Sequence, residues 1–284
     1  MLIGIFVTVS LLVSLGVCLL AEAFTGLSWL WILPLTAAGA FAVILVLWFL
    51  MVVIMSYTAD MKNKQEQDNK FYRWVLQHTI DAIFLLLGVR VHTKGFEQKL
   101  PEGRFLLVSN HLHDIDPAII LHCFPKSRLG FIGKREVKEM FLAGPFLKMT
   151  MGQFVNREND REALKTILEC IQIIKDDKAS VAVFPEGYIH KEDRRLHTFR
   201  PGVFKIAQKA KVPVVVCTLR DTHTALGKIM HLKRADVHLH LVGIIPAKEL
   251  EGVTAVDVSH RVYDMMVADL GPELVHSKED TENT

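Results

Sequence analysis

The sequence FLLVSNHLHDIDP, residues 105–117, joins a run of apolar residues to a polar loop. The apolar run is typical of a strand, and the loop that follows it contains two histidines and two aspartates. In open parallel sheets, the loops at the carboxyl ends of the strands carry the residues that act on ligands. The position and the content of this loop therefore indicate a functional site.

On either side of this stretch, short strand patterns alternate with helical patterns. We expect strands at residues 104–109, 129–132, 153–155, 180–184, 213–219 and 237–245. We expect helices at residues 71–88, 160–174 and 201–210, the last of which begins with a proline at a first-turn position. This alternation predicts an α/β fold, a largely parallel sheet with flanking helices.

Two apolar segments precede this domain. Residues 2–24 contain one charged residue, Glu22, and residues 29–55 contain none. Because about 20 apolar residues cross a hydrocarbon core about 30 Å thick, we expect an N-terminal pair of membrane helices. The four basic residues within residues 62–73 favour a hairpin with both ends in the cytoplasm. A re-entrant pair in one leaflet is the alternative, whereas a cleaved signal peptide lacks its basic first region.

The chain accordingly divides into a membrane-embedded hairpin (1–57), an α/β domain (58–276) and a polar tail (277–284). A formal net charge of +2 is too small to indicate a nucleic-acid partner. The four cysteines form no CxxC pair, so they indicate neither a zinc site nor a disulfide framework. A reducing, cytosolic setting for the domain fits these cysteines best.

His111 and Asp116 are the candidate catalytic pair in the polar loop. A turn can bring the Asp116 carboxylate to one ring nitrogen of His111, which leaves the other nitrogen to remove a proton from a hydroxyl. The same spacing arises by chance, and a histidine near a carboxylate is usually structural. A second strand-end loop, residues 184–187 (FPEG), strengthens the catalytic reading, because a carboxylate followed by glycine can hold a polar ligand close to the backbone.

Four motifs follow one another along the chain. They are Asn110-His111 with Asp116, residues 152–157 (GQFVNR), residues 184–187 (FPEG) and residues 212–215 (VPVV). In this order and spacing they resemble the motifs of the glycerol-phosphate and lysophosphatidic acid acyltransferase superfamily. The apolar hairpin is similar to that of bacterial members. The resemblance implies a glycerolipid acyltransferase fold behind a membrane helix pair.

The resemblance also implies the reaction. His111 would be the general base on the hydroxyl of a lysophosphatidic acid-like glycerolipid, and Asp116 would orient it. The acyl donor would be a thioester, acyl-CoA or acyl carrier protein, with no cofactor and no metal, and the product would serve phospholipid biosynthesis. The implied location is a bacterial inner membrane with the domain facing the cytoplasm. The oligomeric state is not readable from the sequence.

The same resemblance assigns the substrate-binding residues. Lys134 and Arg157 would bind the acceptor phosphate, and Glu186 and Gly187 would line the acceptor pocket. From the residues alone, Arg157 could instead form a surface ion pair with its acidic neighbours, and Lys134 could be a solvated loop residue.

The loop after Gly187 departs from the family pattern, which has a small hydroxyl residue and a basic residue there. Residues 188–190 are Tyr-Ile-His instead, and the last motif lacks its second proline. Lys191, Arg194 and Arg195 follow closely enough to supply positive charge. The acceptor therefore stays open, with another lysophospholipid or a membrane alcohol as the alternative.

Two other classes of protein compete with this reading. A metal-dependent hydrolase would use the clustered histidines and aspartates of residues 111–116, although their order differs from that of an HxHxDH metal motif. A non-enzymatic module would bind an anionic lipid headgroup through the same loops. Residues 140–149, rich in large apolar side chains, would rest on the membrane, line an acyl groove or lie in the core.

Overall fold

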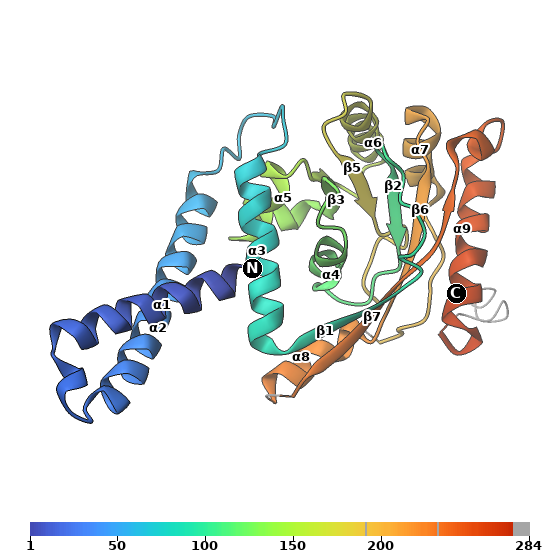
Figure 1. Ribbon diagram of the computed structural model, residues 1–284. Helices are drawn as coiled ribbons and strands as arrows, with labels where there is room; N and C mark the ends of the chain where they lie inside the picture. The colour runs from blue at the N-terminus through green and yellow to red at the C-terminus, as the bar shows by residue number, and fades with distance from the viewer. Residues whose placement is uncertain (191, 232, 275–284) are drawn as a thin grey trace.

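The structure, a computed structural model, describes residues 1–190, 192–231 and 233–274 (Figure 1). The strands are β1 (Val89–Lys94), β2 (Leu106–Ser109), β3 (Leu129–Lys134), β4 (Gln153–Val155), β5 (Ser180–Val183), β6 (Val214–Arg220) and β7 (Ala235–Ile245). The helices are α1 (Leu2–Leu20), α2 (Trp29–Thr58), α3 (Lys70–Leu87), α4 (Asp116–Cys123), α5 (Ala143–Met149), α6 (Asp160–Lys175), α7 (Lys205–Ala210), α8 (Thr222–Met230) and α9 (Ala255–Leu270). Short 3-10 turns are η1 (Ala23–Thr25), η2 (Arg135–Glu139), η3 (Pro201–Phe204), η4 (Ala247–Leu250) and η5 (Pro272–Leu274).

The strands form one seven-stranded sheet in the order β1-β7-β6-β2-β5-β3-β4. From β6 to β4 all neighbours are parallel, whereas β7 is antiparallel to β6 and pairs in parallel with the edge strand β1. The carboxyl ends of β2, β3 and β5 therefore meet at one edge of the sheet. The loops that contain the candidate residues begin at this edge.

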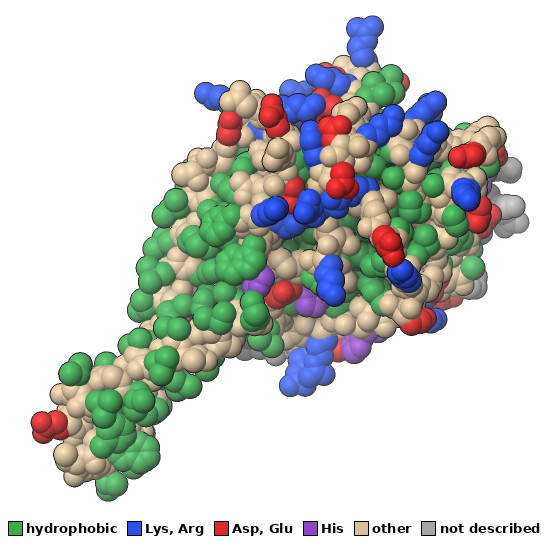
Figure 2. All heavy atoms as spheres, turned by 45° about the horizontal axis from the view of Figure 1, so that its top comes forward, with side chains coloured by type: hydrophobic (Ala, Val, Ile, Leu, Met, Phe, Trp, Pro, Cys, Tyr) green, Lys and Arg blue, Asp and Glu red, His purple; other side chains and the backbone are tan. Residues whose placement is uncertain are grey.

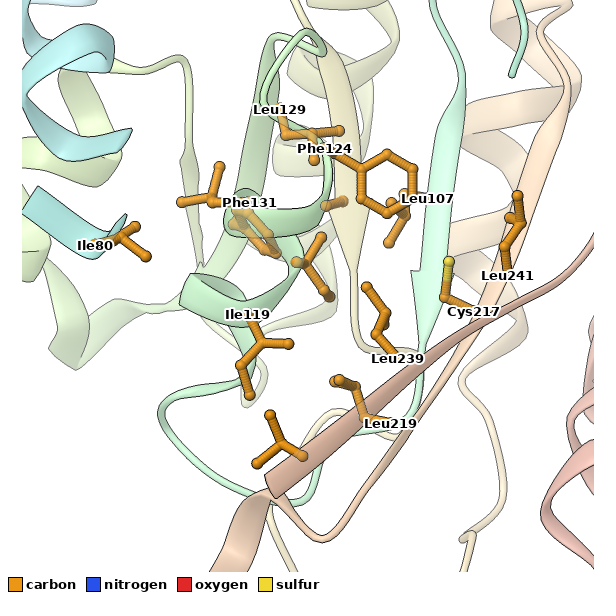
Figure 3. Close-up of a cluster of buried hydrophobic side chains, with 14 of the residues drawn as sticks. Ile80, Leu107, Ile119, Phe124, Leu129, Phe131, Cys217, Leu219, Leu239 and Leu241 are labelled. Carbon is orange, nitrogen blue, oxygen red and sulfur yellow. The ribbon is translucent and has the colours of Figure 1, made fainter. Parts of the chain in front are cut away.

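Helices cover both faces of the sheet, so the domain has three layers (Figure 1). Alternate residues of β2 separate the two cores: Leu107 faces α3 and α4, whereas Leu106 and Val108 face α6, α7 and α9. Figure 3 shows the first of these cores, where Leu107, Ile119 of α4 and Phe131 of β3 converge. Burial on both faces explains why the central strands read as continuous apolar runs.

Local signals fix the ends of the helix that connects the hairpin to the domain. The side chain of Asn69 accepts hydrogen bonds from two backbone N–H groups in the first turn of α3. Gly88 ends α3 in the left-handed region with φ +68°, a conformation that glycine adopts without a steric penalty. The next residue, Val89, begins β1, so the chain passes from α3 directly into the sheet.

The helices α1 and α2 form a hairpin that projects from the domain and carries mainly apolar side chains on its surface (Figures 1 and 2). Their mean hydropathies are 2.6 and 2.8, and only 28% and 11% of their most apolar windows are buried. Both helices are long and apolar enough to cross a membrane, by length and composition. Inside the hairpin, the Ser14 hydroxyl donates to the backbone oxygen of Leu33 at 2.6 Å and lies 2.6 Å from the hydroxyl of Thr36.

The base of the hairpin packs firmly on the domain. Val52 and Met55 of α2 share a core with Val75 of α3 and Phe146 of α5. Trp48 donates its indole N–H to the Thr79 hydroxyl at 3.0 Å. The hairpin is thus joined to the helices that flank the candidate site.

The predicted α/β class, with a largely parallel sheet and flanking helices, is confirmed. The expected strands are present, and the helix expected at residues 201–210 is the 3-10 turn η3 followed by α7. The sequence patterns missed β1, α4, α5, α8 and α9 and did not reveal that β7 reverses direction. Lys134, expected in a loop, is the last residue of β3. The predicted polar tail and Lys191 lie outside the described residues.

Candidate active site

The predicted pair is assembled by the loop between β2 and α4. Nδ1 of His111 lies 2.9 Å from Oδ2 of Asp116. Because a carboxylate only accepts hydrogen bonds, this contact places the imidazole proton on Nδ1 and leaves Nε2 with its lone pair. The His111 side chain is 15% exposed and the Asp116 side chain is fully buried. This is the arrangement of a general base with an orienting carboxylate.

The Asp116 carboxylate also organises the loop backbone. Oδ2 accepts from the backbone N–H of Leu112 at 2.6 Å and of His113 at 2.9 Å. Asp116 is the first residue of α4, where the partial positive charge of a helix N-terminus favours a carboxylate. One oxygen atom therefore fixes both the course of the loop and the orientation of the base.

Two further contacts hold this loop on the sheet. The Asn110 side chain donates to the backbone oxygen of Leu219 at 3.0 Å and accepts from its N–H at 2.7 Å, which ties the end of β2 to β6. The ring of Phe184, at the end of β5, stacks on the His111 ring with centroids 4.0 Å apart and planes 10° apart. Both the position of His111 and the plane of its ring are therefore set before any ligand arrives.

Glu186 lies behind the loop and is 6% exposed. Oε1 accepts from the backbone N–H of His111 at 2.8 Å, and Oε2 accepts from that of His197 at 3.1 Å. Burial raises the pKa of the Glu186 carboxyl to about 8, and these two hydrogen bonds oppose the rise. Contrary to our expectation, Glu186 is not among the residues that line the cavity beside His111. It supports the backbone of the base.

A cavity of about 630 Å³ opens beside His111. Its walls are mainly apolar and come from α3, α4, α5 and the segment before α5, with Val52 of α2 at the side of the hairpin. Residues 140–149 contribute Met140, Leu142, Ala143, Phe146 and Leu147 to these walls. Of the readings of this segment, the apolar groove therefore describes it best, although Phe146 is buried as well.

Polar side chains gather at one part of the cavity wall. Lys134, Arg157 and Gly187 line it together with His111, as does Tyr188. Lys134 is exposed and Arg157 is half-buried, and burial lowers the pKa of the Arg157 guanidinium, which nevertheless stays charged. Neither forms a salt bridge with a carboxylate in the described part of the chain. The surface ion pair considered for Arg157 is thus not formed.

Arg194, one of the cations expected to replace the missing basic residue, takes another position. It donates to the backbone oxygen of Leu112 at 2.7 Å and is not among the residues that line the cavity. Among the described residues, no group of three or more His, Cys, Asp or Glu is arranged to hold a metal ion. In place of metal ligation, His113 accepts the N–H of Ile115 at 3.3 Å through Nδ1.

The sequence reasoning missed three contributors to the site. Phe184 was part of a quoted motif but had no assigned role, and the helix α3 carries no polar signal that would relate it to the cavity. Arg200 precedes Pro201 at the start of η3 and lies with its guanidinium over the Tyr188 ring. No local pattern relates these residues, because they approach one another only in the folded chain.

Comparisons with known proteins agree with the fold and the site. A family model described as "Acyltransferase" matches residues 89–220. The chain is 25% identical to the 1-acyl-sn-glycerol-3-phosphate acyltransferase of Saccharomyces cerevisiae over 64% of its own length and 60% of that protein. It is 26% identical to the human 1-acyl-sn-glycerol-3-phosphate acyltransferase alpha over 74% of its own length and 72% of that protein.

The fold is also that of a solved structure. The 1-acyl-sn-glycerophosphate acyltransferase of Thermotoga maritima superposes with a TM-score of 0.59 at 21% identity, over 80% of this chain and 89% of that one. The chain belongs to the glycerol-phosphate and lysophosphatidic acid acyltransferase superfamily, a class of enzymes. The relatives that define this class are the 1-acyl-sn-glycerol-3-phosphate acyltransferases.

Proposed function

We propose that this protein transfers a fatty acyl group from acyl-CoA or acyl carrier protein to the hydroxyl of a lysophosphatidic acid-like glycerolipid. The observation that carries the proposal is the His111–Asp116 pair at the wall of an apolar cavity that also carries two cations. An acyl chain matches the apolar walls, and the phosphate of a lysophospholipid matches the cations. The names of the yeast and human relatives support the same acceptor.

The chemistry requires one base and no covalent enzyme intermediate. Nε2 of His111 removes the hydroxyl proton while the hydroxyl oxygen attacks the thioester carbonyl carbon. The carbon–sulfur bond then breaks, an ester remains on the acceptor, and the thiolate leaves as a thiol with the proton from the imidazolium. Asp116 holds the ring in position and stabilises the imidazolium throughout.

Transfer assays with the purified full-length protein in mixed micelles test the proposal. Acyl-CoA and acyl carrier protein donors are each offered with a panel of lysophospholipids, monoacylglycerol and long-chain alcohols. We expect acylation of lysophosphatidic acid, loss of it by at least about 10³-fold in His111→Ala, and retention in His113→Ala, the neighbouring histidine. If wild type acylates none of these acceptors, the protein is not an acyltransferase of this kind.

The same assays separate the other two classes. A metal-dependent hydrolase would lose its activity to a strong chelator, whereas the mechanism proposed here has no metal step. A lipid-binding module would retain lysophosphatidic acid without acylating it, and His111→Ala would not change its behaviour.

We further propose that the α1–α2 hairpin is embedded in a membrane, a bacterial inner membrane in the simplest case, with the α/β domain on the cytoplasmic side. The exposed apolar surface of both helices supports this, as does Val52, which brings the hairpin into the cavity wall. A lysolipid could then enter the site without full transfer into water. A membrane-impermeant maleimide tests the topology with Glu22→Cys. Labelling from the side opposite the domain indicates a spanning hairpin, no labelling from either side indicates a re-entrant one, and labelling from the domain side contradicts both.

A further inference from the structure

The loop after Gly187, where the sequence departs from its family, brings two arginines onto one aromatic ring. The guanidinium carbon of Arg157 lies over the Tyr188 ring at 5.2 Å from the centroid, and that of Arg200 lies over it at 5.3 Å. Cation–π attraction favours both contacts at these distances. Arg157 comes from the loop after β4 and Arg200 from the residue before η3, so the ring joins two segments that are 43 residues apart in sequence.

Backbone geometry explains how Arg200 reaches this ring. Its N–H donates to the backbone oxygen of Pro185 at 2.9 Å, which holds the start of η3 against the FPEG loop. Gly187 has φ +84°, and a Cβ atom built there would lie 3.1 Å from Nε of Arg200. The missing side chain at position 187 therefore leaves the space through which the Arg200 guanidinium passes.

The three side chains present unused hydrogen-bond donors. Arg200 donates through Nη2 to the Tyr188 hydroxyl at 3.3 Å, so this oxygen accepts and its own proton is directed elsewhere. Neither arginine forms a salt bridge within the described part of the chain; Glu136 is the acidic residue that acts on Arg157 from a longer distance. The Tyr188 ring is 49% exposed and lines the cavity that contains His111.

We propose that Arg157, Tyr188 and Arg200 form the subsite for the phosphate monoester of the acceptor. Tyr188 and Arg200 replace the small hydroxyl residue and the adjacent basic residue that the family places after Gly187. The inference rests on the proposed acyltransferase function and extends it to two residues without an assigned role. Two guanidinium groups held on one ring can meet a dianionic group with forked hydrogen bonds, and the Tyr188 hydroxyl supplies a further donor.

A phosphate ester also occurs in the acyl donor, both in CoA and in the prosthetic group of acyl carrier protein. We assign the subsite to the acceptor, because the arginines share one cavity with the base that must receive the acceptor hydroxyl. Steady-state kinetics distinguish the two sources, since KM is measured separately for lysophosphatidic acid, for monoacylglycerol and for the donor.

The variants are Arg200→Gln, Arg200→Lys, Tyr188→Leu and Tyr188→Phe, with Arg161→Gln as a control on the exposed face of α6. We expect Arg200→Gln to raise KM for lysophosphatidic acid about tenfold or more and to change kcat little. Arg200→Lys should give an intermediate value, because one point charge replaces the fork. Tyr188→Leu should raise the same KM at least about threefold, and Tyr188→Phe less, because the ring that orients both arginines remains. KM for monoacylglycerol and for the donor should not change.

Other outcomes overturn the inference. If KM for the donor rises and KM for lysophosphatidic acid does not, the subsite binds the donor phosphate. If Arg200→Gln and Arg161→Gln behave alike while wild type acylates lysophosphatidic acid, the subsite is wrong and the acyltransferase function stands. If wild type acylates nothing, the proposed function fails. The subsite is then tested by equilibrium binding of lysophosphatidic acid to wild type and Arg200→Gln, and equal affinities reject it.

Discussion

Nδ1 of His111 lies 2.9 Å from Oδ2 of Asp116, and the same oxygen accepts two backbone N–H groups of the intervening loop. The relationship is therefore more than a contact between two side chains. Closure of the loop onto Asp116 determines where His111 can lie, and Phe184 determines how its ring turns. A change at Asp116 should consequently affect catalysis and local order together.

Asp116→Asn tests the charge of this oxygen with little change in volume. We expect kcat to fall by about 10³-fold or more, because a neutral amide does not stabilise the imidazolium. The amide nitrogen would also occupy the position of Oδ1, which is buried without a hydrogen-bond partner among the described residues. Circular dichroism checks that the variant is folded. A folded variant with wild-type kcat would remove Asp116 from the mechanism.

Glu186 should make stability depend on pH. Burial raises its pKa from 4.5 to about 8, so between these values the folded state binds a proton that the unfolded state has lost. The free energy of unfolding should then fall as pH rises from about 4.5 to about 8, by at most about 1.4 kcal/mol per pH unit from this group. Denaturation of wild type and Glu186→Gln across this range measures the difference. The variant should show a flatter pH dependence, and parallel curves would contradict the assignment.

Gly187→Ala tests the close approach of Arg200. Alanine is strained at φ +84°, and its Cβ would press on Nε of Arg200 at 3.1 Å. We expect a loss of about 1–2 kcal/mol in stability and a higher KM for lysophosphatidic acid. Gly252→Ala is the matched control, because Gly252 has φ +74° and nothing lies within 4 Å of its Cβ position. If both variants lose the same stability and neither changes KM, the Arg200 contact has no role.

Ala118→Phe tests whether the apolar cavity holds the acyl chains. Ala118 is on the first turn of α4 and lines the cavity, so a phenyl ring there should take up space beside His111. We expect kcat/KM for long-chain acyl donors to fall more than that for short-chain donors, since longer chains need more of the volume. Competition between donors of different length measures this ratio. An equal loss for all chain lengths would indicate general damage to the fold.

Much of the architecture could be predicted because it depends on local patterns. The buried strands around residues 106–109 and 180–183 appear as apolar runs whether or not their neighbours are known. The N-terminal segments are apolar enough that no partner is needed to interpret them. The helices α4 and α8 were missed because they are short and their apolar residues follow no clear helical period. Their stability comes from packing on the sheet.

By itself, the sequence determined the class of fold, the membrane-type hairpin and the pairing of His111 with Asp116, because these depend on residues close together in the chain. Only the tertiary structure decided what surrounds the pair. It placed Glu186 behind the loop, brought Arg200 to Tyr188, and formed the cavity from α3, α4 and α5. These contacts join segments far apart in the chain, and the packing of helices on the sheet sets their distances, so no local pattern could reveal them.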